Sequence, residues 1–332
     1  MQFTFSEEQT MLGDSLSRTL ERGGDVDALM ELGAGAALLT EEQGGFGGTG
    51  TDMLMVFRTL GRGLAVTPVL DSVVLGAGIL AAAGEADLAE QAAAGAIRVA
   101  VALDEPGQRY DGTVVTRAAG DRLTGEKTMV AGADQATHLI VSATDGLYLV
   151  EAGAEGLTMR SFALMDGGRA AEVSLLNTPA RLIGGLDLLA RPRAAAILAI
   201  CADALGVMER ASELTTEYLK TRKQFGRPIG SFQALQHRMA DLVTEIEQAR
   251  SAVWNLAVHL DGDDRDRHVA ATKSLVGRVA RRVAEETVQL HGGIGMTEEY
   301  ELAPMVRRLL AADARFGDSD HHLERFVALW AA

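Results

Sequence analysis

Residues 218–242 have the sequence YLKTRKQFGRPIGSFQALQHRMADL, and this stretch constrains the fold strongly. A helical pattern ends here in a basic cluster of Arg222, Lys223 and Arg227 and is interrupted by a Gly-Arg-Pro turn. Ser231 has the side chain of an N-cap, so we expect a second helix to begin there. Guanidinium groups bind pairs of phosphate oxygens, and a helix N-terminus offers free amide donors. The segment predicts either a phosphate-binding corner or a helix corner with solvated arginines, and spacing alone favours neither.

The sequence after this corner has the period of long, packed helices. Apolar residues recur in alternating steps of four and three along 235–260, which is the pattern of a helix that packs against another helix. Further helical patterns cover 269–290, 301–314 and 321–330. We therefore predict a C-terminal four-helix bundle within residues 189–332.

The residues before the corner divide into a helical part and a β-rich part. Ser6 and Gln9 form a capping box ahead of an amphipathic helix, and an Ala- and Leu-rich texture continues to about residue 95. Short β-branched segments separated by Gly, Asp or Asn turns follow. The predicted fold class is α+β, mainly α, with an N-terminal helical domain (1–95), a middle antiparallel β-domain (96–188) and the C-terminal bundle (189–332).

The composition excludes several classes of protein. Of 332 residues, 47% are hydrophobic and 23% charged, and no apolar run approaches the roughly 20 residues of a membrane helix, so we expect a soluble protein. The N-terminus has neither a basic nor an apolar leader, which favours the cytoplasm. The lone Cys201 excludes a disulfide framework within the chain. The adjacent His321 and His322 would point in different directions on a helix, so we predict no metal site. A net charge of −15 disfavours nucleic acid and anionic membranes as partners.

A second motif, QLHGGIG, occupies residues 289–295. Glycines after a helix permit a left-handed cap and let a ligand approach the backbone closely. As a dinucleotide fingerprint the motif is weak, because that fingerprint must follow a strand and this one ends a helix. A helix cap alone would also explain it.

Together the two motifs resemble the C-terminal domain of acyl-CoA dehydrogenases, in which R-K-x-F-G-x-x-I-x-x-F-Q and Q-x-x-G-G-x-G flank a long helix. The order of helices, β-domain and bundle is similar as well, so the resemblance covers nearly the whole chain. It implies α,β-dehydrogenation of an acyl-CoA thioester, with FAD at a subunit interface where the basic corner and the double-glycine turn face each other. The implied FAD contacts are Arg222, Phe225 and Gln233 toward a neighbouring subunit's FAD, and Gln289, Gly292 and Gly293 along the adenosine diphosphate part.

The β-domain departs from the family pattern at the flavin ring. Asp104-Glu105-Pro106-Gly107 resembles the family's T-E-P-G segment, but the loop that follows is shortened. In the strand G-x-K-x-W-I-T, Met129 replaces Trp and Ala131 replaces a Thr or Ser hydroxyl. A polarisable Met can still cover a ring face, whereas Ala131 has no hydroxyl to donate. The resemblance thus places Met129 and Ala131 at the flavin, without the indole ring and the hydroxyl that usually touch it.

The resemblance also implies two positions for the carboxylate base of this reaction, and we expect both to lack it. Counting from the motifs, these positions fall at Ala196 and Phe316, and neither side chain can accept a proton. Asp318 is a weak candidate close by, although an Asp before the last helix is better explained as an N-cap. The weaker candidates are Asp313, Asp320 and Asp203.

The altered base positions resemble those of a partner chain from two-gene acyl-CoA dehydrogenases, including those of lipid or sterol catabolism, which form α2β2 tetramers. Such a chain would complete the FAD pocket of its partner and pass electrons to an electron-transfer flavoprotein or a similar acceptor. Two alternatives remain open. One is a self-sufficient homo-oligomer, a homotetramer that uses Asp318, and the other is a flavin-free scaffold subunit.

Overall fold

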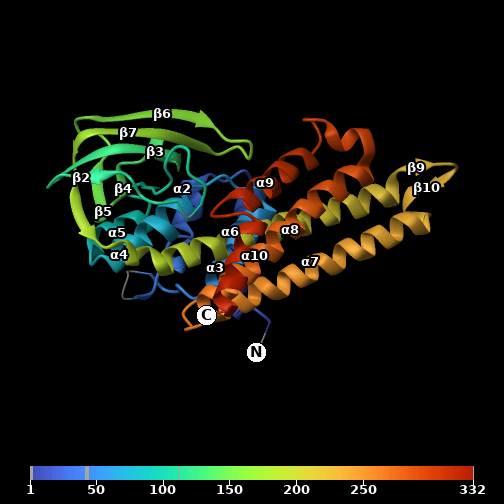
Figure 1. Ribbon diagram of the computed structural model, residues 1–332. Helices are drawn as coiled ribbons and strands as arrows, with labels where there is room; N and C mark the ends of the chain where they lie inside the picture. The colour runs from blue at the N-terminus through green and yellow to red at the C-terminus, as the bar shows by residue number, and fades with distance from the viewer. Residues whose placement is uncertain (1–2, 42–44, 111, 332) are drawn as a thin grey trace. The chain divides into compact units, whose positions relative to one another are not determined.

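The computed structural model describes residues 3–41, 45–110 and 112–331 (Figure 1). Its internal contacts separate two compact units that interleave along the chain. The first unit contains Met1–Arg22, Met53–Ala65 and Ile197–Ala332, and the second contains Gly23–Asp52 and Val66–Ala196. The predicted α+β, mainly α class is confirmed, whereas the division into three domains, with boundaries near residues 95 and 188, stays a prediction.

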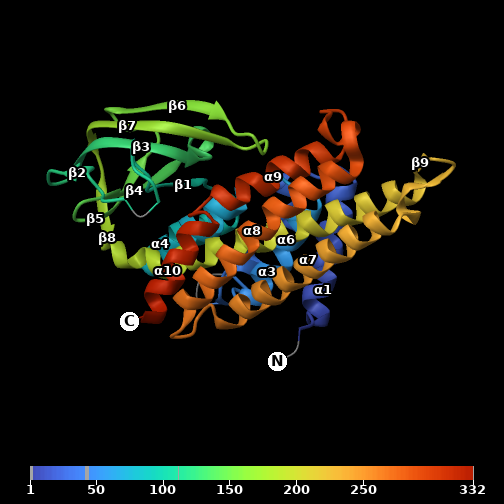
Figure 2. The ribbon, with the colours of Figure 1, turned by 45° about the vertical axis from the view of Figure 1, so that its right-hand side comes forward.

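The first unit is built from helices, with α6, α7 and α8 as its longest members (Figures 1 and 2). Its helices are α1 (Glu7–Glu21), most of α3 (Gly50–Arg62), most of α6 (Ala190–Thr221), α7 (Gln233–His259), α8 (Arg265–His291), α9 (Leu302–Ala314) and α10 (Ser319–Ala331). Helix α8 packs against α7, α9 and α10. The predicted seam of α7 is buried from Leu242 onward, at Leu242, Ile246, Ala249, Val253, Leu256 and Leu260.

Local signals set where some of these helices begin. The capping box of α1 is confirmed, because the Ser6 hydroxyl accepts a hydrogen bond from the Gln9 amide (3.1 Å) and the Gln9 side chain accepts one from the Ser6 amide (3.0 Å). The N-cap predicted at Ser231 is wrong. Ser231 lies in a short 3-10 turn (Ile229–Ser231), and its hydroxyl donates to the carbonyl of Pro228 (2.7 Å). Helix α7 begins at Gln233, and Phe232 is its N-cap.

The second unit contains two four-stranded sheets and several short helices (Figure 1). One sheet has the order β1-β4-β5-β8, from β1 (Val99–Ala102), β4 (His138–Ala143), β5 (Gly146–Glu151) and β8 (Arg181–Gly184). The other has the order β2-β3-β7-β6, from β2 (Arg117–Ala118), β3 (Arg122–Ala131), β7 (Arg169–Pro179) and β6 (Leu157–Ala163). The helical segments are α2 (Val26–Glu31), a π-helical segment (Val69–Ala77), α4 (Gly78–Ala82), α5 (Ala86–Ala93) and short 3-10 turns at Ala36–Leu38, Ala133–Gln135 and Leu186–Leu189.

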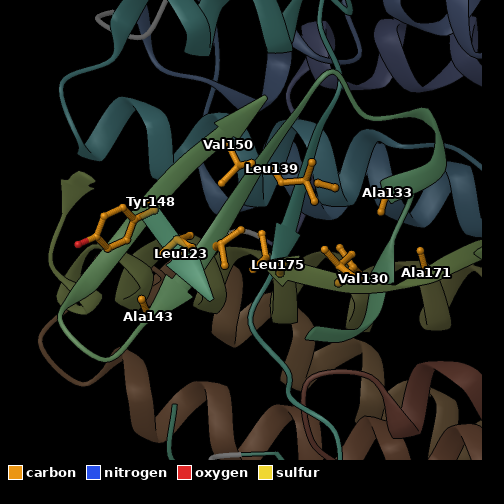
Figure 3. Packing of buried hydrophobic residues seen from close by; sticks show 13 residues of the cluster. Leu123, Val130, Ala133, Leu139, Ala143, Tyr148, Val150, Ala171 and Leu175 are labelled. Atoms are coloured by element: carbon orange, nitrogen blue, oxygen red, sulfur yellow. The ribbon is translucent and has the colours of Figure 1, made fainter. Parts of the chain in front are cut away.

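Strand pairing in this unit is antiparallel apart from one pair. Strands β1 and β4 are parallel, with Val99 opposite His138, because the chain leaves β1, forms β2 and β3 in the other sheet, and returns to β4 in the same direction. The two sheets share one hydrophobic core (Figure 3), to which β3 and β7 contribute Leu123 and Leu175 and β4 and β5 contribute Leu139 and Val150. This face-to-face packing fixes β3, the strand that carries Met129 and Ala131, against the core.

In the part of the chain that the structure describes, every helix is too short or too polar to cross a lipid bilayer.

Candidate functional site

The basic corner forms a small hairpin at the ends of α6 and α7 (Figure 1). Strand β9 (Lys223–Gln224) pairs with β10 (Arg227–Pro228) through a two-residue loop in which Phe225 and Gly226 both have positive φ, 53° and 78°. Two left-handed residues define a type I′ turn, which favours Asn or Gly over a bulky aromatic residue. The Phe225 side chain is nonetheless 91% exposed. An exposed aromatic ring on a strained turn suits contact with a ligand or another chain better than it suits stability.

The cations of this hairpin differ in their availability. The Arg227 guanidinium lies 4.1 Å from the ring centroid of Phe232, so it is engaged in a cation–π contact. Arg222 and Lys223 are exposed, and their side chains form no hydrogen bond or ion pair with any residue that the structure describes. These two positive charges are therefore available to an anionic ligand.

The double-glycine turn follows α8 directly and is open on its outer side. Gly292 has a φ of 66° and a ψ of −144°, a backbone conformation that a side chain would strain. A Cβ atom placed on Gly292 or on Gly293 would have no atom within 4 Å. A ligand can thus approach the backbone of this turn (Gly292–Met296) closely, while Gln289 lies one helical turn before it.

An aromatic contact joins the two segments within one chain. The Tyr218 hydroxyl of α6 donates a hydrogen bond to the carbonyl of His291 (3.2 Å), and the two rings stack 4.4 Å apart. His291 is buried, its Nδ1 lies 2.8 Å from the Thr287 carbonyl, and burial lowers the pKa of its ring. The double-glycine turn is thereby held to the end of α6, directly before Arg222. Whether the two segments also face each other across a subunit boundary stays a prediction.

The residues present fit the diphosphate part of FAD. Phosphate oxygens are bound by guanidinium and ammonium groups and by backbone amides in an open, glycine-containing turn. Arg222 and Lys223 supply the free cations, Gly292 and Gly293 supply the open backbone, and Gln233 at the first turn of α7 can add an amide donor. The donor set has the charge and the access that a diphosphate requires.

The two residues predicted to contact the flavin ring, Met129 and Ala131, lie in the second unit, on β3. An irregularity in the β3–β7 register between Lys127 and Val130 gives Met129 a φ of 54° and turns its side chain outward, where 52% of it is exposed. Ala131 ends the strand and has no side-chain donor. Met129 offers an apolar, polarisable surface to a flavin ring, and Ala131 offers no hydroxyl.

The two positions at which the resemblance predicts the base, 196 and 316, are occupied by an alanine and a phenylalanine. Ala196 is fully buried within α6. Phe316 lies in the connection between α9 and α10 with a φ of 59°, and its ring lies 5.0 Å from the Arg315 guanidinium. Asp318 accepts a hydrogen bond from the His321 amide through Oδ1 (2.9 Å), which is the N-cap interaction expected ahead of α10.

The other candidate carboxylates have structural contacts. Asp313 is buried, pairs with the Arg281 guanidinium (2.6 Å) and accepts a hydrogen bond from the Ser319 amide (3.0 Å). Asp203 is buried and receives two hydrogen bonds of 2.9 Å from Arg308. A guanidinium group therefore neutralises the negative charge of Asp313 and another that of Asp203. Asp320 is exposed in the first turn of α10.

Sequence reasoning missed a buried cation beneath the α9–α10 connection. Lys273 is 1% exposed, and its Nζ donates to the carbonyls of Ala312 (3.0 Å), Asp313 (2.7 Å) and Gly317 (2.8 Å). Burial lowers the pKa of Lys273. The helical spacing of Val269, Lys273 and Val276 puts this lysine on the core face of α8, a signal that could have identified it.

Comparison with known proteins agrees with this architecture. The family model of the acyl-CoA dehydrogenase C-terminal domain matches residues 194–328. Acyl-CoA dehydrogenase FadE27 of Mycobacterium tuberculosis is 34% identical over 86% of this chain and 81% of its own. The structure of the ChsE4-ChsE5 complex from Mycobacterium tuberculosis contains a similar chain (28% identity, TM-score 0.91, coverage 100% and 99%). A chain of the Tcur3481-Tcur3483 steroid ACAD is also similar (29% identity, TM-score 0.89, coverage 98% of each chain). The chain belongs to the acyl-CoA dehydrogenase family of FAD-dependent oxidoreductases.

Proposed function

We propose that this chain is an acyl-CoA dehydrogenase subunit that contributes to an FAD site and relies on a partner chain for the proton-abstracting carboxylate. The observation that carries the proposal is the identity of the two expected base positions, a buried alanine at 196 and a phenylalanine at 316. Dehydrogenation requires a base at the substrate α-carbon. A chain without one at these positions needs a second chain to supply it.

The contacts of three of the four candidate carboxylates support the same proposal over a self-sufficient enzyme. Asp318 caps a helix, and Asp313 and Asp203 neutralise guanidinium groups. A general base must be within hydrogen-bonding reach of the proton that it removes and must have an oxygen free to accept it. Recruiting any of these groups would break a contact that holds the helical unit together. A flavin-free scaffold, in turn, would not need exposed cations beside an open glycine turn.

When bound, FAD supplies the acceptor for the hydride that leaves the substrate β-carbon. The chain's own contribution is to bind and orient. Arg222 and Lys223 would hold phosphate oxygens, and the turn at Gly292 would admit the diphosphate to its backbone. Phe225 would cover an apolar face of the cofactor, and Met129 would lie against the flavin ring. These two apolar side chains would keep water from the parts of the cofactor that they cover.

The proposed partner is another acyl-CoA dehydrogenase chain, in a tetramer of two kinds of subunit. The ChsE4-ChsE5 complex and the Tcur3481-Tcur3483 steroid ACAD support this, because both names pair two different chains. The latter also favours a lipid- or sterol-derived acyl-CoA as the substrate class. Electrons would pass to an electron-transfer flavoprotein or a similar acceptor.

The decisive experiment compares flavin content with and without a partner. The chain is purified alone and after co-expression with a second family member encoded beside it, and the visible flavin spectrum is recorded per mole of chain. We expect weak flavin retention alone, and in the complex a full flavin spectrum that an acyl-CoA substrate bleaches. A yellow protein that is bleached at the same rate in the absence of any partner would rule out the partner dependence.

Substitution of Arg222 tests the cofactor contact itself. Arg222→Ala should weaken FAD retention by the complex about 10- to 100-fold, because it removes a charge-assisted pair of hydrogen bonds worth about 1.5–3 kcal/mol. The matched control is Arg18→Ala, which alters an arginine of α1 in the same unit. Dialysis followed by measurement of flavin fluorescence gives the dissociation constants. Equal retention by both variants would refute a role for Arg222.

A further inference from the structure

A cluster of two histidines and an aspartate lies where α7 meets α8, away from the residues assigned to FAD. His259 is the last residue of α7, Asp264 precedes α8, and His268 lies in the first turn of α8. One ligand atom from each of the three lies within 4.8 Å of the other two. The His259 and His268 rings stack at a centroid distance of 4.1 Å, with an interplanar angle of 23°. Both rings therefore present their edges to the same region beside the Asp264 carboxylate.

The hydrogen bonds of His259 leave it in the form that binds a metal ion. Its Nδ1 lies 2.8 Å from the backbone carbonyl of Asn255. A carbonyl oxygen only accepts, so Nδ1 must carry the proton, and in the neutral ring Nε2 is left with a lone pair. Metal-binding histidines show this arrangement, in which one ring nitrogen donates to a carbonyl and the other faces the ion.

Asn255 also contacts the second histidine. Its side-chain amide lies 2.8 Å from Nδ1 of His268, whose Nε2 lies 3.0 Å from Asp264 Oδ2. A rotation of the amide by half a turn presents its oxygen to Nδ1, which then carries the ring proton and leaves Nε2 free. Asn255 can thus hold both rings in the ligand tautomer, one through its backbone and one through its side chain.

The distances and charges suit a small divalent ion. A tetrahedral zinc ion with bonds of about 2.0–2.1 Å separates its ligand atoms by about 3.3 Å, close to the 3.0 Å between His268 Nε2 and Asp264 Oδ2. The Asp264 carboxylate adds a negative charge beside the two rings. The carboxyl end of α7 adds negative potential at His259.

We propose that His259, Asp264 and His268 form a binding site for a divalent transition-metal ion of the zinc class, which links the end of α7 to the start of α8. Two imidazoles and one carboxylate are the ligand set that zinc, nickel, cobalt and copper ions prefer over magnesium or calcium. With three protein ligands, water completes the coordination. The spacing of these residues does not match a familiar sequence motif, because a helix hairpin brings them together.

The test uses the full chain without an affinity tag and Zn²⁺ alone as the ligand. Isothermal titration calorimetry should show one ion per chain, and Zn²⁺ should raise the thermal unfolding temperature. His259→Gln and His268→Gln should each weaken binding by at least about tenfold, since loss of even an outer hydrogen-bonding partner costs that much. The control His237→Gln replaces a histidine elsewhere on α7 and should bind as the unaltered chain does.

A second measurement on the unaltered chain removes any dependence on how the variants fold. Paramagnetic Co²⁺ at one equivalent should broaden the ring-proton resonances of His259 and His268 before those of His237. Substoichiometric Zn²⁺ binding, variants with unchanged affinity, or broadening that spares the two clustered rings would each overturn the site. None of these readouts depends on flavin or turnover, so they are independent of the proposed function.

Discussion

Asp318 shows how one residue's local contacts decide between a chemical and a structural role. It lies two positions from Phe316, where the resemblance places a base, yet its Oδ1 accepts the His321 amide in the first turn of α10. Asparagine caps helices about as well as aspartate does, but it cannot act as a base. The substitution Asp318→Asn would therefore remove a base but preserve an N-cap.

We expect Asp318→Asn to leave turnover of the complex within about twofold and the unfolding free energy within a few tenths of a kcal/mol. Asp318→Ala should cost about 1 kcal/mol of stability, again with little effect on turnover once the protein is folded. Steady-state kinetics and urea unfolding of both variants give the values. A fall of about 100-fold or more in kcat for Asp318→Asn, with FAD retained, would identify this carboxylate as the base.

Strand β3 depends on a buried ion pair next to the proposed flavin surface. Lys127 is fully buried, and its Nζ donates to Glu105 (2.7 Å) and to the Ser142 hydroxyl (2.9 Å). Glu105 also accepts hydrogen bonds from the Thr116 hydroxyl (2.7 Å) and the Val115 amide (2.8 Å). Burial raises the pKa of Glu105, but the hydrogen bonds from Lys127, Thr116 and Val115 together outweigh it and lower the pKa to about 2.

The ion pair should make stability fall in acid. Because the folded pKa of Glu105 is about 2 and its ordinary value is 4.5, its contribution is present above about pH 4.5 and is lost as the pH falls toward 2. Glu105→Gln should lower the unfolding free energy at neutral pH by about 3 kcal/mol, since it leaves Lys127 buried without a counter-charge. It should also flatten the acid dependence.

Urea unfolding at pH 6 and at about pH 3 measures both effects. The matched control is Glu126→Gln, an exposed position on the same strand, which should change stability by less than about 0.5 kcal/mol. An equal loss of stability in both variants, or an unchanged acid slope in Glu105→Gln, would contradict the role of the ion pair.

At the scale of the whole molecule, the hairpin between α6 and α7 is the feature that a monomer does not explain. A chain with a net charge of −15 repels copies of itself and similar acidic chains. The hairpin presents two free cations together with the nearly fully exposed ring of Phe225. Local positive charge and an aromatic anchor are the features that concentrate binding energy at subunit interfaces.

We expect Phe225→Asp to weaken assembly of the complex by at least about tenfold while leaving the unfolding temperature of the isolated chain nearly unchanged. The side chain contributes little to the monomer, because it is exposed. Native mass spectrometry across a dilution series reports the assembly. Met11→Asp alters an exposed apolar side chain on α1 and serves as the control. Equal assembly by both variants would exclude the hairpin from the interface.

The sequence alone determined the features that depend on neighbours along the chain. The capping box of Ser6 and Gln9 and the periodic seam of α7 follow from helix geometry over a few turns, so both were predictable. The paired motifs were sufficient to indicate the family and its cofactor. The absence of a carboxylate at 196 and 316 could likewise be read from residue identity.

Only the tertiary structure decided the features that depend on residues far apart in the sequence. Long-range packing pairs β1 with β4 in parallel and buries Lys273. It also brings Arg281 to Asp313 and Arg308 to Asp203. The start of α7 after Phe232 was decided by the hairpin that precedes it. A side chain's partner is set by which surfaces meet once the apolar faces are buried, and no local pattern records that choice.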